Sequence, residues 1–412
     1  MNNTIKLLGA AAIALAWPWG AHAAENSVKI GVVGPFTGPA ATSGISMKRA
    51  YEFTARQVND AGGVLVKGKK LPIEFIFEDS QSRPDVGVSA AQKLLTRDKV
   101  DVLLAELLQS SVALAIMELS PAHPEVVFMS GQPVSIEIAN RIERDPVKYK
   151  NFWKHDFNSD ASSYTLKETV KLLVQQKKLV PKKKTVAFVI EDTDFGRANV
   201  EFATRYLKED GWTVAATETV PQGHTDFYPQ ISKLRAQEPD LVYSIFTSAN
   251  SGIALVKQVK EQDVRAVHIG TFYPTLAEFN KGAGKNAEGL ILIPFLFDAK
   301  HNPEHKAFAD KIAPHVGGTV SMDHAYGACA AEVLIDAIKR AQDTAPAVLN
   351  KAFAATDYKC AVGRWVFDPK NHSPKIGKGF LTLAAAQNQD GVYRAIWPAD
   401  APGATEFRRA AD

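Results

Sequence analysis

Short apolar runs alternate with amphipathic segments along most of this 412-residue chain. The apolar runs predict buried strands, and apolar positions that recur with helical spacing between them predict helices. Strands that alternate with helices are typical of a parallel sheet with helical crossovers. In the first half, the predicted strands are 28–33, 71–79, 100–105 and 126–129, and the predicted helices are 44–61, 83–98 and 110–119.

The same alternation starts again after residue 163, which indicates a second α/β unit. A chain of this length also exceeds one ordinary core, so we expect two domains. Between the units, 148–163 lacks Gly and Pro, which predicts an ordered crossing rather than a flexible linker. The later predicted strands are 185–190, 213–220, 241–246, 264–270 and 289–297, the helices are 165–176, 197–210, 226–237, 251–262 and 326–341, and a hairpin-like tail covers 363–394.

The N-terminal residues have the features of a secretory signal peptide. Lys6 precedes an apolar run over 7–20, and Ala-His-Ala at 21–23 matches the small-x-small pattern of a cleavage site. The run is interrupted by Pro18 and is shorter than the roughly 20 apolar residues of a spanning helix, which argues against an anchor. No Cys follows the cleavage site for acylation. We therefore expect a signal peptide over 1–23 and a soluble periplasmic protein.

Composition and motifs exclude several functional classes. The formal net charge of +3 is too small to indicate a nucleic-acid partner. The sequence contains no nucleophile elbow, zinc-protease motif, phosphate-binding loop or dinucleotide fingerprint, and its histidines lack metal-ligand spacing. Asp194-Phe195-Gly196 spells a kinase triplet without a kinase context. We expect no cofactor, no metal and no enzymatic activity.

The chain has two cysteines, Cys329 and Cys360. Two cysteines alone do not make a zinc site, and an oxidising compartment permits a disulfide between them. The sequence favours the alternative that both remain buried free thiols.

The predicted strands end in residues that suit a small ligand. In open parallel sheets, ligands bind beyond the carboxyl ends of the strands, and the helix N-termini there attract anions such as carboxylates. Ser110 and Ser111 form the best such site, although both also suit an ordinary helix cap. The strand-end residues are Thr37, Gly38, Asp79, Ser80, Gln109, Ser110, Ser111, Ser130, Gly131, Gln132, Asp194, Phe195, Thr247, Ser248, Phe272 and Tyr273.

Nine sequence segments, spread in order over nearly the whole chain after 1–23, carry a family pattern. The segments are VVGPFTGP at 32–39 with Gly44, NDAGG at 59–63, EDSQ at 78–81, SSVA at 110–113, DFG at 194–196, PDLV at 239–242, AEG at 287–289, AYG at 325–327 and GRWVFD at 363–368. The opening segment is quite specific, and the others are strong together. They resemble the leucine/isoleucine/valine-binding type of periplasmic receptor.

The resemblance implies a type I periplasmic binding fold. This is an α/β fold class with two Rossmann-like lobes, each built on a parallel-type sheet. Three crossing strands join the lobes, which close on a ligand. It implies 24–155 plus 288–360 as the first lobe and 156–287 plus 361–412 as the second. It also implies that a monomer delivers a small molecule to the permease and ATPase subunits of an ABC importer.

The resemblance further suggests which groups hold the ligand. Carboxylate-binding positions fall near Gln109, Ser110 and Ser135, but the acid that would hold an ammonium falls on Phe272. Phe195 replaces a common Tyr, and a small residue, Ser43, stands where branched-chain receptors carry a bulky one. The expected ligand-binding residues are Gln109, Ser110, Ser111, Ser130, Gly131, Gln132, Ser135, Phe195, Thr247, Ser248, Phe272 and Tyr273.

These substitutions favour an aromatic or aliphatic carboxylate as the ligand, followed by an amide. Three alternatives stay open. Glu106 could reach the cleft and bind the amine of a true branched-chain amino acid, the protein could be a small-molecule sensor of the same fold, and the aromatic residues at the strand ends could simply fill the core.

Overall fold

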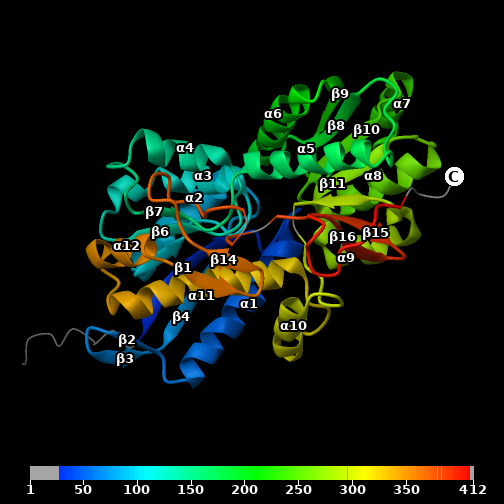
Figure 1. The fold of residues 1–412 in the computed structure, drawn as a ribbon. Helices are drawn as coiled ribbons and strands as arrows, with labels where there is room; N and C mark the ends of the chain where they lie inside the picture. The colour runs from blue at the N-terminus through cyan, green and yellow to red at the C-terminus, as the bar shows by residue number, and fades with distance from the viewer. Residues whose placement is uncertain (1–26, 295, 378, 382, 409–412) are drawn as a thin grey trace, which may run out of the picture.

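The computed structural model describes residues 27–294, 296–377, 379–381 and 383–408. The expected signal peptide, 1–23, lies outside the described residues. Two α/β lobes lie side by side, each built around its own sheet (Figure 1).

The first lobe holds a parallel sheet with the strand order β4-β1-β5-β6-β7. Successive residues of its strands point to opposite faces, so Val32 and Leu104 pack on one side while Val33 and Leu103 pack on the other. Both faces are covered by helices, which explains the continuous apolar runs. The strands are β1 (Val28–Gly34), β4 (Ile73–Asp79), β5 (Val102–Leu104), β6 (Val127–Ser130) and β7 (Phe152–Lys154).

Helices α2, α3 and α4 cover one face of this sheet, and α1, α11 and α12 cover the other. The lobe also carries two small hairpins, β2–β3 and β13–β14. The bounds are α1 (Ala41–Asp60), α2 (Pro84–Lys93), α3 (Ser110–Met117), α4 (Ile136–Arg144), α10 (Pro303–Val316), α11 (Met322–Ala341), α12 (Pro346–Ala354), β2 (Val64–Val66), β3 (Lys69–Leu71), β13 (Tyr358–Cys360) and β14 (Gly363–Trp365), with short helical turns η1 (Leu94–Asp98) and η2 (Ser120–Ala122).

The second lobe holds a sheet with the strand order β16-β15-β12-β11-β10-β8-β9. Its first five strands in sequence pair in parallel, and the hairpin β15–β16 closes one edge antiparallel. The bounds are β8 (Thr185–Glu191), β9 (Thr213–Val220), β10 (Leu241–Phe246), β11 (Val267–Phe272), β12 (Ile291–Ile293), β15 (Ala385–Gln389), β16 (Val392–Trp397), α5 (Ser159–Gln175), α6 (Asp194–Glu209), α7 (Tyr228–Gln237), α8 (Ala249–Glu261), α9 (Ala277–Ala283), η3 (Tyr273–Thr275) and η4 (Gly284–Ala287).

The chain passes between the lobes three times within the described residues. Strand β12 lies between β11 and β15, although the sequence boundary at 288 assigned it to the first lobe. We therefore propose that the three crossings follow β7, β12 and β14. The C-terminal part of the chain also differs from the single hairpin predicted over 363–394. It contains two separate hairpins, β13–β14 in the first lobe and β15–β16 in the second.

The prediction of two free thiols is wrong, because Cys329 and Cys360 form a disulfide. Cys329 lies on α11 and Cys360 ends β13, and the packing of the hairpin on this helix brings their Cα atoms to 5.6 Å. That distance is in the usual range for a disulfide. The sequence could not reveal this proximity, since it depends on how two segments that are 31 residues apart pack together.

Candidate ligand-binding site

The loop after β5 is fixed by the buried carboxyl group of Glu106. Glu106 Oε1 accepts hydrogen bonds from the backbone nitrogens of Leu108, at 3.1 Å, and Gln109, at 3.2 Å. The backbone nitrogens of Gly131 and Gln132 donate to the carbonyl oxygens of Glu106 and Leu107, which locks the loops after β5 and β6 together. A Cβ on Gly131 would lie 2.7 Å from the carbonyl oxygen of Leu107, so this contact requires glycine. Glu106 therefore orders the loop that leads into α3.

Three of the predicted residues in the first lobe carry polar atoms that are buried and make no hydrogen bond with any described residue. These atoms are Gln109 Nε2, Ser130 Oγ and Gln132 Oε1. Buried polar atoms are normally hydrogen-bonded, so a group of them at the ends of β5 and β6 is suited to a polar ligand. Gln109 also immediately precedes α3, whose N-terminal N–H groups favour an anion.

The other predicted serines of this lobe have structural partners. Ser110 Oγ accepts from the backbone nitrogen of Ser135 at 3.3 Å, and Ser135 Oγ caps α4 by accepting from the nitrogen of Glu137. Ser111 is partly exposed on the first turn of α3. Ser135 therefore has a capping role, whereas Ser110 does not cap α3 and instead ties the start of α3 to the start of α4.

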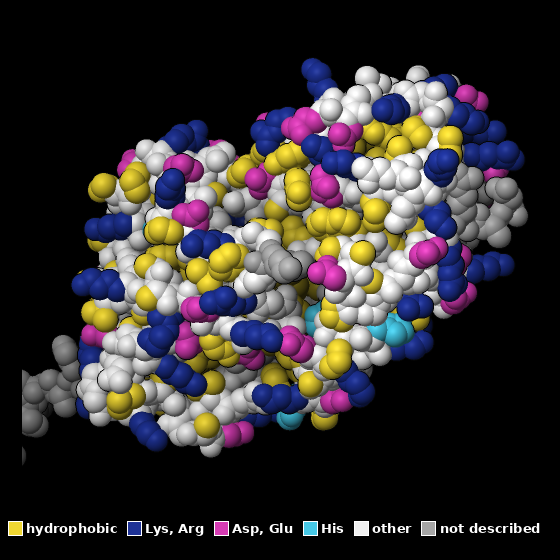
Figure 2. Space-filling model, viewed as in Figure 1, with side chains coloured by type: hydrophobic (Ala, Val, Ile, Leu, Met, Phe, Trp, Pro, Cys, Tyr) yellow, Lys and Arg dark blue, Asp and Glu magenta, His cyan; other side chains and the backbone are white. Residues whose placement is uncertain are grey.

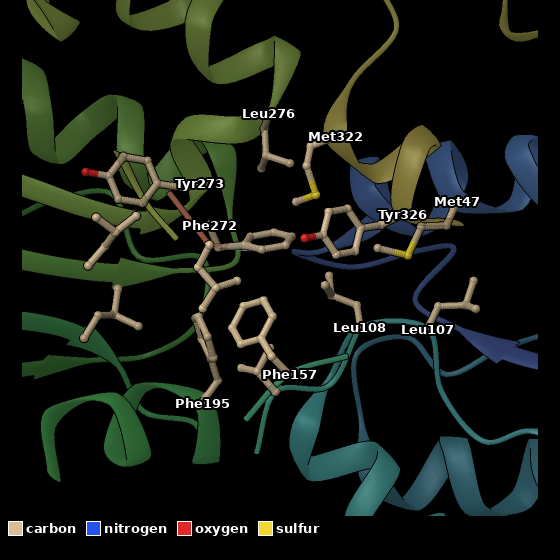
Figure 3. Close-up of a cluster of buried hydrophobic side chains, with 14 of the residues drawn as sticks. Met47, Leu107, Leu108, Phe157, Phe195, Phe272, Tyr273, Leu276, Met322 and Tyr326 are labelled. Carbon is tan, nitrogen blue, oxygen red and sulfur yellow. The ribbon is translucent and has the colours of Figure 1, made fainter. Parts of the chain in front are cut away.

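Phe272 ends β11 in a rare backbone conformation, with φ 69° and ψ −68°. This is the geometry of a γ-turn that is strained for any residue with a side chain, and such strain is found at functional sites. The Thr275 hydroxyl donates to the carbonyl oxygen of Phe272 at 2.7 Å and supports the turn. The buried ring points out of the second lobe toward Tyr326 on α11 of the first lobe (Figure 3).

Tyr273, expected beside Phe272 in the site, lies in the core of the second lobe instead. Its hydroxyl is 2.8 Å from Ser244 Oγ, and its ring fills the space over Gly252 and Gly270. In Figure 3 the hydroxyl points away from Phe272 and Tyr326. The turn at Phe272 reverses the direction of the chain, so neighbouring side chains point to opposite sides.

The remaining predicted residues of the second lobe also lie at strand ends. Thr247 donates from Oγ1 to Glu191 at 2.8 Å and accepts from Gln222 Nε2 at 2.8 Å. Ser248 caps α8 by accepting from the backbone nitrogen of Ser251. Phe195, at the start of α6, is buried beside Phe157 (Figure 3).

An apolar cluster joins the two lobes, and most of its residues were not predicted from the sequence. Figure 3 shows it as a wall of side chains from both lobes, and apolar side chains are also visible along the seam between the lobes in Figure 2. Glu191 could have been found, because it directly follows a predicted strand. Ser321, the N-cap of α11, could have marked the start of that helix. The missed residues of the wall are Met47, Leu107, Leu108, Phe157, Leu276, Met322 and Tyr326.

A second buried acid, Asp323, lies in the first turn of α11. Burial raises the pKa of Asp323 to about 7, and the hydroxyl of Ser43 on α1 partly offsets this. Asp323 Oδ1 makes no hydrogen bond with the part of the chain that the structure describes. The region around the small residue Ser43 is therefore polar.

Comparisons with known proteins agree with this architecture. A family model described as periplasmic binding protein matches residues 27–388. The Leu/Ile/Val-binding protein homolog 3 of Brucella melitensis is 25% identical over 374 residues, which cover 90% of this chain and 92% of the relative. A solute-binding protein of an ABC transporter from R. palustris, solved with benzoate, has a TM-score of 0.77 at 19% identity, covering 92% of this chain and 98% of that one. The branched-chain amino acid transporter substrate binding protein of Streptococcus pneumoniae, solved with isoleucine, has a TM-score of 0.74 at 18% identity, covering 89% and 97%.

Two α/β lobes with parallel-type sheets define a type I periplasmic binding fold, which confirms the expected fold class. The chain belongs to the periplasmic binding protein family, as a solute-binding protein of the branched-chain-amino-acid type of ABC transporter. Such proteins are small-molecule receptors. No helix among the described residues is long and apolar enough to span a bilayer.

The buried carboxyl of Glu106 should make folding stability depend on pH. Burial raises its pKa to about 8 from an ordinary value of 4.5. The stability that depends on a protonated Glu106 is complete below the pKa of this group in the unfolded chain. It is lost as the pH rises through about 8, the pKa in the folded protein. Between about pH 6.5 and about pH 9, the wild type should lose about 2 kcal/mol more unfolding free energy than Glu106→Gln, which keeps the accepting oxygen. Urea unfolding at both pH values measures this difference, and equal losses would contradict it.

Proposed function

We propose that this protein captures a small aromatic or aliphatic carboxylate between its lobes and delivers it to an ABC importer. It would act in the periplasm as a monomer, with a permease and cytoplasmic ATPases as partners. An amide would be the next choice of ligand. The observation that carries this proposal is the buried Phe272 ring, which occupies a strained turn between the lobes where a counter-charge for an ammonium would be expected.

The polar side of the site supports a carboxylate. Gln109 Nε2 is a buried donor at the start of α3, and the helix N-terminus adds further N–H groups and partial positive charge. Glu106 does not oppose this, because burial raises its pKa to about 8 and the carboxyl is largely neutral near pH 7. An anion could therefore bind at this loop without a lysine or arginine.

The apolar side of the site supports a ring or a branched hydrocarbon. Phe157, Phe195 and Phe272 lie around one region between the lobes, and Leu108 and Met322 complete it (Figure 3). Well-formed aromatic pairs add about 0.5–1.5 kcal/mol each beyond the burial of area. The structural neighbour from R. palustris, which was solved with benzoate, is consistent with this choice.

A branched-chain amino acid is the second candidate. It is favoured by Asp323, a buried acid that has an unpaired oxygen near Ser43 and could balance an ammonium. The neighbour from Streptococcus pneumoniae was solved with isoleucine.

A thermal-shift and calorimetric screen of purified protein separates the candidates. The ligands are benzoate, cyclohexanecarboxylate, benzamide, leucine and isoleucine. At about 100 times its dissociation constant, a true ligand adds about 2.7 kcal/mol of stability. We expect the acids to stabilise the protein and the amino acids to have little effect. Strong stabilisation by leucine or isoleucine alone would reject the carboxylate proposal in favour of the second candidate.

A further inference from the structure

We infer that Ser130, His155 and Asp156 form a polar subsite for a hydroxyl group of the ligand, so that the preferred guest is a hydroxylated aromatic carboxylate. This inference rests on the proposed function, because it assigns a second recognition point to the same ligand. The three residues lie where the chain leaves the first lobe, at the end of β6 and in the crossing after β7.

The ring of His155 is held in place from several sides. It stacks on Trp365 with the ring centroids 4.8 Å apart and the planes at 12°. The indole Nε1 of Trp365 donates to the carbonyl oxygen of His155 at 2.7 Å, and the backbone nitrogen of His155 donates to the carbonyl oxygen of Ser130 at 3.2 Å. The imidazole is therefore positioned by contacts that leave both of its nitrogens unused.

Oδ1 of Asp156 accepts from the backbone nitrogen of Phe157 at 2.8 Å. Five other side-chain atoms of Ser130, His155, Asp156 and the nearby Ser159 have no hydrogen-bond partner among the described residues. They are both ring nitrogens of His155, Oδ2 of Asp156 and the hydroxyl oxygens of Ser130 and Ser159, and all four side chains are completely buried. Leaving a buried polar group unpaired is destabilising. Several such groups in one place indicate that a partner completes them.

The charges of the cluster suit a hydroxyl better than an ion. Burial lowers the pKa of His155 to about 3, so the ring is neutral and offers one donor and one acceptor. Burial lowers the pKa of Lys154 to about 7, and its Nζ already donates to the carbonyl oxygens of Asp156, at 2.6 Å, and Phe157. Burial also raises the pKa of Asp156 to about 7, so its carboxyl can accept or donate near neutral pH. A hydroxyl matches this set because it donates one hydrogen bond and accepts others.

The cluster adjoins the apolar wall of the proposed site. Ser130 immediately precedes Gly131 and Gln132, and Phe157 follows Asp156 directly and lies in that wall (Figure 3). Tyr326 packs edge-on against Trp365 at 6.0 Å and points its hydroxyl toward Phe272 (Figure 3). A ring bound against Phe157 could thus present a hydroxyl to His155.

Calorimetric titration of the wild type with benzoate, 3-hydroxybenzoate and 4-hydroxybenzoate tests the inference. A site built to bond a hydroxyl discriminates strongly against the analogue that lacks it. We expect at least one hydroxybenzoate to bind about tenfold more tightly than benzoate, or better. Hydroxybenzoates that bind no more tightly than benzoate would overturn the subsite, whereas failure of every acid to bind would overturn the proposed function itself.

Two histidine variants locate the effect. His155→Phe keeps the stack on Trp365 but removes both nitrogens, and it should abolish the hydroxyl preference while leaving benzoate affinity within about threefold. His372→Phe is the matched control, because His372 also stacks on a tryptophan, Trp153, but its Nδ1 is already bonded to a backbone carbonyl oxygen. Loss of affinity for all three acids alike in His155→Phe would overturn the inference. If His155→Phe does not fold, the comparison of the three acids on the wild type still decides the inference.

Discussion

Replacing Phe272 with glutamate should lower the affinity for an aromatic acid by more than about 100-fold, because an unpaired buried carboxylate costs several kcal/mol. The new charge would lie at the tip of the strained turn that faces Tyr326, next to the region where the ligand carboxylate is proposed to bind. Isothermal titration with the best ligand of the screen measures the loss.

Phe272→Leu is the control for this experiment. It keeps an apolar side chain and removes only the ring contacts, which are worth about 0.5–1.5 kcal/mol, so the affinity should fall by roughly two- to tenfold. Both variants should retain the wild-type circular dichroism spectrum. If folded Phe272→Glu binds the acid as tightly as the wild type, Phe272 lies outside the ligand site and the choice of a carboxylate loses its main support.

Removing the disulfide should lower the unfolding free energy by about 3 to 4 kcal/mol, because Cys329 and Cys360 close a loop with a sequence separation of 31. The variant is Cys329→Ala combined with Cys360→Ala, and urea unfolding in the absence of reductant measures the change. Both positions are buried, so alanine adds no polar group to the core.

Reductant provides the matching control for the disulfide. It should destabilise the wild type toward the value of the double variant and leave the double variant unchanged. Because α11 carries Met322 and Tyr326, the loss should also loosen one wall of the site. Equal stability of the oxidised wild type and the double variant would contradict the prediction.

Many strands and helices of the first lobe, and many strands of the second, were predicted from the sequence. Runs such as those ending at Val33, Leu104 and Phe246 are apolar on both faces, because their sheets are covered by helices on both sides. The first helix was predicted to begin later than it does, and α4, α9, α10 and α12 were missed. Element limits depend on caps and contacts that a periodic pattern does not contain.

The candidate site was only partly accessible from the sequence. The rule that ligands bind at strand ends identified Gln109, Ser130 and Gln132, because parallel strands bring their carboxyl ends to one edge of the sheet. The same rule grouped Tyr273 with Phe272, although one ring lies in the core and the other between the lobes. A positive φ at a phenylalanine cannot be seen in a sequence.

By itself, then, the sequence determined the two α/β units, the loops that meet at the ends of their strands and the residue types that these loops carry, since all three follow from local periodicity and chain order. Only the tertiary structure decided that Cys329 and Cys360 are bonded, that β12 belongs to the second sheet and that Tyr326 faces Phe272. Each of these depends on packing between segments far apart in the chain, where local propensity carries no information.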